Sequence, residues 1–207
     1  MKNVLTSEFK TRLWEAVKSV EKQSQVELVV VMRSSSHDYR YIALSWGIVA
    51  ALLVHSYVVL APEIFEDWLV YCAPLIGFTA TYAVAHLPWV IRLSAGFACL
   101  QKNVEIMARA TFQKGGIQHT QAKIGVLIYC SFLEKIVYIL PDRGVETALP
   151  AEEWQNLHTD FQQIFAHRNP GEALLKQIQQ TARLFNRYLP LINGDINELP
   201  DVLEIDL

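Results

Sequence analysis

Two long apolar stretches dominate the hydrophobicity pattern of the chain. They run from Ile42 to Ala61 and from Trp68 to Ile91, and neither contains Lys, Arg, Asp or Glu. A helix rises about 1.5 Å per residue, so each stretch is roughly 30 Å or more long, enough to cross the hydrocarbon core of a bilayer. The short acidic loop 62–67 joins the two stretches. The pattern therefore predicts a transmembrane helical hairpin.

A long helical hairpin buried in a soluble core is the alternative interpretation. A core helix rarely runs twenty residues without a charged position, because its far side usually reaches water. Small residues recur every four positions on both stretches, a spacing that lets helices approach closely in lipid. They are Ala43, Gly47 and Ala51 on the first stretch, and Ala73, Gly77 and Thr81 on the second.

The charges that flank the hairpin predict its orientation. Arg33 and Arg40 precede the first stretch, Arg92 and Lys102 follow the second, and the loop 62–67 contains three acidic residues and no basic one. The positive-inside rule then places both termini in the cytoplasm and the loop on the other side. We expect a multi-pass protein of the cell inner membrane, whose first partner is the lipid bilayer itself.

The rest of the chain reads as one α/β domain. Residues 26–32 are nearly all aliphatic without alternation, as in a central strand covered on both faces. Residues 124–131 and 135–140 form two further strands, and the three residues between them are too few for a parallel crossover, so these strands are antiparallel. Apolar residues at helical spacing predict helices over residues 7–24, 97–115, 154–165 and 174–189.

These elements divide the chain into three segments. Residues 1–40 supply the first part of the domain, residues 41–92 the hairpin, and residues 93–207 the remainder of the domain with an acidic C-terminal tail. No continuous apolar run occurs in the first twenty-five residues, so we expect no secretory signal.

Composition narrows the function only slightly. The hydrophobic content of 52% is raised by the hairpin, and a net charge of −3 without a long basic run argues against nucleic-acid binding. The three cysteines are far apart and form no CxxC pair, so they predict neither a zinc site nor a redox motif.

Candidate chemistry rests on scattered polar residues near predicted strand ends. Asp38 follows the first strand, His119 precedes the second, and Glu134 and Asp142 flank the third. Carboxylates from separate loops can hold Ca²⁺ or Mg²⁺ through oxygen ligands, and a histidine can act as an acid or base. The simpler interpretations are a solvated linker for Asp38, a turn-forming side chain for Asp142 and a loop hydrogen bond for His119.

One stretch resembles a known domain. The pattern TxxxxGVLIYxSxxExxVxILxD, from Thr120 to Asp142, is similar to the core of the TPM domain in its branch of bacterial membrane proteins, and the closing NELPD resembles the same branch. The resemblance implies an α/β/α sandwich with a small mixed sheet. The matching positions are Asp38, Tyr39, Thr120, Gly125, Glu134 and Asp142.

The resemblance leaves two functions open, because some members of this family are phosphatases or bind divalent cations and others are membrane-associated accessory proteins. The first hypothesis is a membrane-anchored accessory or interaction protein whose cytoplasmic domain binds another membrane protein or complex. The second is a divalent-cation-dependent phosphatase-like hydrolase, in which Asp38 and Asp142 hold the metal and Glu134 or His119 assists. The sequence does not decide whether the protein is an enzyme.

Overall fold

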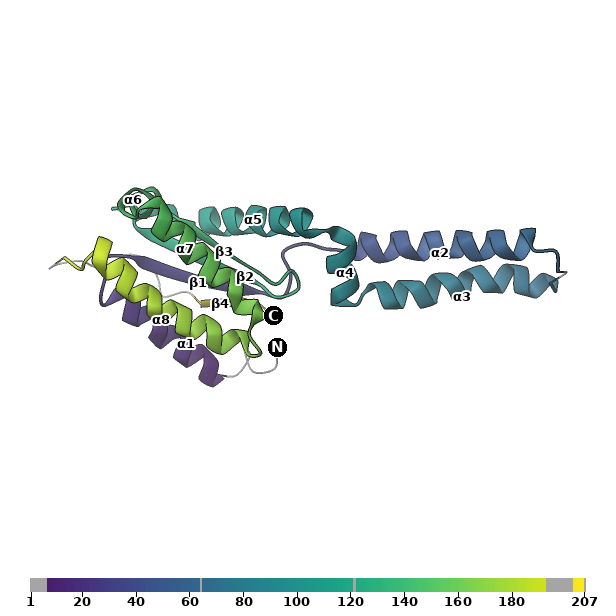
Figure 1. Ribbon diagram of the computed structural model, residues 1–207, viewed down its shortest axis with the longest axis horizontal. Coiled ribbons are helices and arrows are strands. Elements are labelled where there is room, and N and C mark those ends of the chain that lie inside the picture. The colour runs from purple at the N-terminus through teal and green to yellow at the C-terminus, as the bar shows by residue number, and fades with distance from the viewer. Residues whose placement is uncertain (1–6, 64, 121, 193–202, 207) are drawn as a thin grey trace. The chain divides into compact units, whose positions relative to one another are not determined.

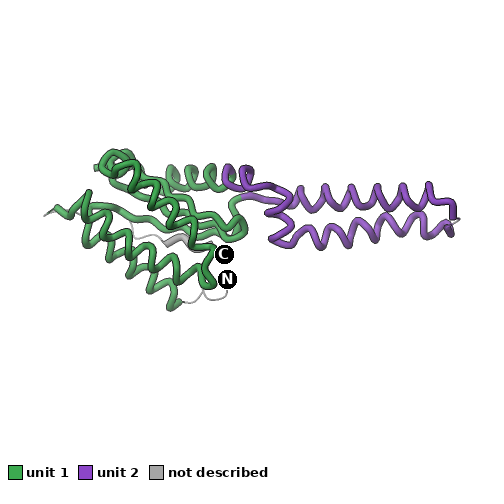
Figure 2. Tube along the Cα trace, viewed as in Figure 1, with its two compact units in different colours: residues 1–36, 103–207 green, residues 37–102 purple. Residues whose placement is uncertain are grey.

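The computed structural model describes residues 7–63, 65–120, 122–192 and 203–206, excluding the side chains of His119 and of residues 203–206. The chain forms two compact units (Figure 2). Unit 1 combines residues 1–36 with residues 103–207, and unit 2 comprises residues 37–102. The sequence predicted an insertion at residues 41–92, and unit 2 begins four residues earlier and ends ten residues later.

Unit 1 is built on a mixed four-stranded sheet with the order β3-β2-β1-β4. Strand β1 pairs in parallel with β2 and β4, and β2 pairs with β3 as the predicted antiparallel hairpin. The mixed α/β fold that the sequence predicted is confirmed. The strands are β1 Glu27–Arg33, β2 Gly125–Ser131, β3 Ile136–Pro141 and β4 Leu203–Asp206.

Helices cover both faces of this sheet, which explains why β1 and β2 are apolar without alternation. One face, including Val30 and Ile128, packs in a single core with α1, α7 and α8. The opposite face carries Leu127 and Tyr129, which are also buried, and α5 lies on that side (Figure 1). The helices are α1 Ser7–Glu21, α5 Phe97–Lys114, η1 Ile117–His119, α6 Arg143–Ala148, α7 Ala151–Gln162, η2 Gln163–Ala166 and α8 Pro170–Tyr188.

Unit 2 contains the hairpin of α2 (Arg40–Leu60) and α3 (Asp67–Ala85), followed by α4 (Pro88–Ala95). Both hairpin helices are long and apolar enough to cross a membrane by length and composition. The second apolar stretch, predicted as one helix as far as Ile91, is broken before Pro88. Proline lacks an N–H donor and forces its predecessor out of the helical region, and Leu87 is extended at φ −65° and ψ 132°.

Two glycines allow α2 and α3 to approach closely. A Cβ added to Gly47 would lie 2.8 Å from Cε2 of Phe78, and one added to Gly77 would lie 3.0 Å from Cγ2 of Val54. Both glycines therefore face the opposite helix, as the spacing of small residues indicated.

Candidate functional site

Four buried polar side chains meet beyond the carboxyl ends of β1 and β2. Tyr129 and Ser131 belong to the last three residues of β2, Ser36 follows β1, and Glu134 lies in the turn between β2 and β3. Glu134 is only 3% exposed, and the other three are equally enclosed. A buried carboxylate is costly unless hydrogen bonds satisfy it, so its partners determine what it can do.

Both oxygens of Glu134 accept hydrogen bonds from within unit 1. The backbone N–H of Ser36 donates to Oε1 at 2.8 Å, and the Ser131 hydroxyl donates to Oε2. The Ser36 hydroxyl completes the cluster, because its Oγ lies 2.9 Å from Oγ of Ser131 and 3.3 Å from the phenolic oxygen of Tyr129. Burial raises the pKa of Tyr129, which keeps that phenol neutral.

The backbone reinforces the same junction. The N–H groups of Phe132 and Leu133 donate to the carbonyls of Arg33 and Ser34 at 3.0 and 2.9 Å. Lys135 closes the β2–β3 turn in the left-handed region, at φ 56°. The polar cluster thus holds the segment after β1 against this turn, at the last residues before the chain leaves unit 1.

Asp142 occupies a different place, at the start of α6. It is the N-cap residue of that helix, and its Oδ1 accepts the N–H of Arg143 at 2.8 Å. The other oxygen, Oδ2, is buried and has no hydrogen-bond partner among the described residues. Asp142 therefore caps a helix where the sequence suggested a simple turn, and its second carboxylate oxygen has no partner among the described residues.

The loop before β2 packs tightly against this N-terminus. The N–H of Asp142 donates to the carbonyl of Gly125 at 2.7 Å, and that of Gly144 donates to the carbonyl of Lys123 at 2.8 Å. A Cβ on Gly144 would lie 2.6 Å from the carbonyl oxygen of Ala122, so only glycine fits there without a shift. Carbonyl oxygens of this loop consequently lie close to the start of α6.

The remaining sequence candidates lie elsewhere. Asp38 belongs to unit 2. Its Oδ2 accepts a hydrogen bond from Nε of Arg40 at 2.7 Å, and its Oδ1 accepts one from the backbone N–H of Arg40 at 3.0 Å. The Arg40 guanidinium holds the pKa of the exposed Asp38 carboxyl below its usual range. His119 is the last residue of η1, and its side chain lies outside the described part of the structure.

Metal binding by this set of residues is restricted by those contacts. Among the residues that the structure describes, no group of three or more His, Cys, Asp or Glu side chains is arranged to hold a metal ion. Asp38 is engaged by Arg40, and Glu134 by Ser36 and Ser131. Among these three, Asp142 alone keeps a carboxylate oxygen with no hydrogen-bond partner in the described part of the structure.

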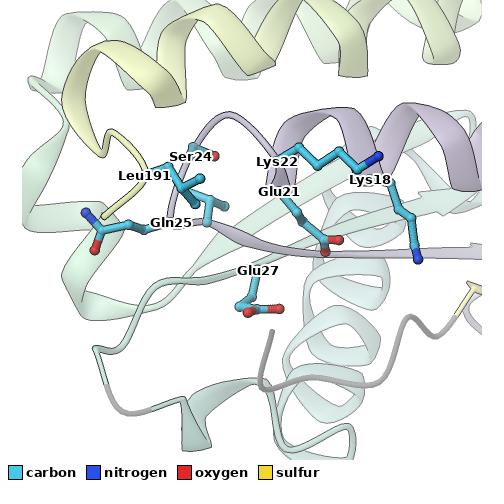
Figure 3. A pocket seen from close by; sticks show the side chains of 8 residues that line it. Lys18, Glu21, Lys22, Ser24, Gln25, Glu27 and Leu191 are labelled. Carbon is cyan, nitrogen blue, oxygen red and sulfur yellow. The ribbon is translucent and has the colours of Figure 1, made fainter. Parts of the chain in front are cut away.

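The sequence did not indicate two features of unit 1. One is the buried hydrogen-bonded cluster of Tyr129, Ser131, Ser36 and Glu134. The sequence signal for it was the pair Tyr129 and Ser131, which are two positions apart and therefore lie on one face of an otherwise apolar strand. The other is a cavity of about 280 Å³ at the amino end of β1 (Figure 3). Its lining consists of Lys18, Glu21, Lys22, Ser24, Gln25, Val26, Glu27 and Leu191.

Comparison with known families identifies this part of the chain. Residues 98–184 match the family model of the TPM domain. The chain therefore contains a TPM domain. The matched segment includes β2, β3 and the positions of Glu134 and Asp142, whereas Asp38 lies before it.

One solved structure extends the likeness of fold beyond the matched TPM segment. The NMR structure of the BA42 protein from the psychrophilic bacterium Bizionia argentinensis aligns with a TM-score of 0.59 at 18% sequence identity, covering 97% of this chain and 94% of that one. At this identity the likeness shows the fold alone. No curated protein matches the sequence.

Proposed function

We propose that this protein is a membrane-anchored interaction protein. The α2–α3 hairpin spans the cell inner membrane, and the TPM domain binds another membrane protein or complex at the cytoplasmic face. The observation that carries the anchor is the exposure of large apolar side chains around both hairpin helices.

These exposed side chains form surfaces that water would disfavour. Leu52 and Leu60 on α2 are 61% and 82% exposed, and Leu75 and Ile76 on α3 are exposed to a similar extent. A soluble monomer rarely leaves apolar patches larger than a few hundred Å² in water. At about 1.5 Å per residue the helices are roughly 31 and 28 Å long, which fits the hydrocarbon core.

Aromatic and charged residues support the depth and the orientation. Trp46, Trp68 and Trp89 are exposed near helix ends, where tryptophan favours the interface between lipid and water. The flanks of the hairpin contain the basic residues Arg40, Arg92 and Lys102. All the charged residues of the loop between α2 and α3 are acidic. The proposal therefore places both termini and the TPM domain in the cytoplasm.

Cysteine reactivity in membrane vesicles tests the anchor. Val49 is exposed midway along α2, and Glu15 is exposed on α1 as a matched control. With the native cysteines replaced, a water-soluble maleimide is expected to label Glu15→Cys rapidly and to label Val49→Cys only after the bilayer is dissolved in SDS. Equal labelling of both positions in intact vesicles would remove the transmembrane hairpin.

The orientation has its own experiment in intact spheroplasts. Glu63 lies in the loop between α2 and α3 and is exposed. A membrane-impermeant maleimide is expected to label Glu63→Cys from outside and to leave Glu15→Cys unlabelled until the cells are lysed. The reverse pattern would place the TPM domain on the outer side.

The binding role is supported by the way the TPM domain uses its polar groups. Glu134 is enclosed and fully hydrogen-bonded, which suits a structural anchor better than a catalytic base that must reach a substrate. After mild detergent extraction, the wild-type protein is expected to migrate with a second protein on native gels. Migration solely as a free protomer at native expression level would count against an interaction role.

The buried Oδ2 of Asp142 favours a second candidate, a divalent-cation-dependent phosphatase-like hydrolase. Asp142 would offer its carboxylate to Ca²⁺ or Mg²⁺, cations that prefer oxygen ligands. Calorimetric titration of the detergent-purified protein with each cation tests this candidate. Micromolar binding that Asp142→Asn abolishes and Asp38→Asn preserves would support a site at Asp142, whereas no binding by the wild type would exclude it.

A further inference from the structure

Helix α4 differs from the two hairpin helices in direction and in surface. It begins at Pro88, immediately after the break that ends α3, and Figure 1 shows it running across the end of the α2–α3 pair. It contacts both of these helices within unit 2. Its eight residues make a helix about 12 Å long, too short to cross a bilayer.

One side of α4 packs on the hairpin. Ile91 is buried there, and the indole Nε1 of Trp46 on α2 donates to the hydroxyl of Ser94 at 3.0 Å. These contacts fix the helix at the end of the hairpin where α2 begins and α3 finishes.

The other side of α4 carries large apolar residues that nothing in unit 2 covers. Trp89 and Leu93 are one helical turn apart and are 57% and 78% exposed. Phe97, just beyond Gly96, is 67% exposed and continues the apolar surface into the start of α5.

Charge distribution indicates which environment covers this surface. Arg92 lies on α4 itself, Lys102 is exposed five residues after Phe97, and Arg40 opens α2. The one acid in the flanks of unit 2, Asp38, is paired with Arg40. Apolar side chains combined with cations are the two features that attract a helix to the boundary between acyl chains and lipid phosphates.

We propose that α4 lies in the plane of the membrane, with Trp89, Leu93 and Phe97 inserted at the headgroup–acyl boundary and Arg92 and Lys102 at the lipid phosphates. This inference rests on the transmembrane hairpin of the proposed function. It gives unit 2 a second, peripheral contact with the leaflet at which α2 begins and α3 ends. The helix limits tilting of the hairpin, because tilting would pull its apolar residues out of the boundary.

Site-directed spin labelling of the full chain in phosphatidylcholine–phosphatidylglycerol vesicles tests the proposal. Labels at Leu93, Val49 and Glu15 are compared through their relaxation by oxygen, which concentrates in lipid, and by a nickel chelate, which stays in water. The Leu93 label is expected about 5–10 Å below the lipid phosphates, the depth typical of in-plane helices. Val49 should report the bilayer interior, and Glu15 should report water.

The outcomes separate this inference from the anchor. A lipid signal at Val49 with a water signal at Leu93 would overturn the in-plane helix and leave the hairpin standing. A water signal at Val49 would overturn the hairpin itself. In the Arg92→Gln, Lys102→Gln variant the Leu93 label is expected to move toward water, and an unchanged depth would overturn the contact of these cations with phosphates.

Discussion

Removing the Glu134 carboxylate should release the segment that leaves β1. In Glu134→Ala the buried N–H of Ser36 and the hydroxyl of Ser131 both lose their acceptor. A hydrogen bond to a charged group contributes about 1.5–3 kcal/mol, so the two together contribute about 3–6 kcal/mol. Because the cavity left by the side chain is enclosed, water replaces these bonds poorly, and we expect a local loss of at least about 3 kcal/mol.

Amide hydrogen exchange of Ser36 measures this loss directly. A change of 3 kcal/mol corresponds to roughly a hundredfold rise in the exchange rate, since each 1.4 kcal/mol is about tenfold. Glu134→Gln keeps an amide oxygen that can accept the Ser36 N–H, so its effect should be about tenfold or less. Exposed Glu15→Ala, on α1, is the control and should leave the rate unchanged.

A Ser36 amide that exchanges equally slowly in Glu134→Ala and wild type would refute the argument. Exchange of the Val30 amide, in the middle of β1, shows whether the sheet itself has opened. If Val30 loses its protection as well, the variant has unfolded globally, and Glu134→Gln becomes the decisive comparison.

Three further predictions concern packing and titration. Gly47→Leu should separate α2 from α3, seen as a longer spin-label distance at the hairpin tip, whereas the same change at exposed Ala80 should not. Burial raises the pKa of the Cys130 thiol to about 12, so maleimide should not modify it at pH 8 while the protein is folded. The hydrogen bond and charge of Arg12 lower the pKa of Glu172 from its ordinary value of 4.5. The ion pair therefore stabilises the fold fully at pH values above 4.5, and this stabilisation is lost as the pH falls through the lowered pKa. In Arg12→Gln, an NMR titration should find a higher pKa for Glu172.

The apolar pattern predicted the long helices and the first three strands well, because burial of apolar faces dominates their formation. It did not predict the short helix α6, which has a single buried residue, Val145. The break at Leu87 was missed because residues 68–91 are uniformly apolar, and only the backbone restriction imposed by Pro88 ends the helix. The pairing of β4 with β1 was also missed, since a short tail strand has no periodicity that specifies its partner.

The candidate site was harder to predict than the fold. The sequence selected Glu134 and Asp142, yet their roles depend on neighbours distant along the chain. Ser36 lies 98 positions before Glu134, and the carbonyls that border α6 come from the loop before β2. Local spacing contains no information about such contacts, so acceptors already satisfied by the protein and acceptors still available look the same in the sequence.

The separation of β1 from β2 has a consequence for biosynthesis. Glu27 of β1 pairs with Gly125 of β2, and the whole hairpin is synthesised between them. At about 5–20 residues per second, roughly 5–20 s pass before the ribosome completes the partner of β1. In the membrane topology proposed above, the hairpin enters the bilayer during that interval, so its insertion precedes closure of the sheet. On that proposal, maturation of the protein depends on the insertion machinery at the membrane before it depends on the folding of its own domain.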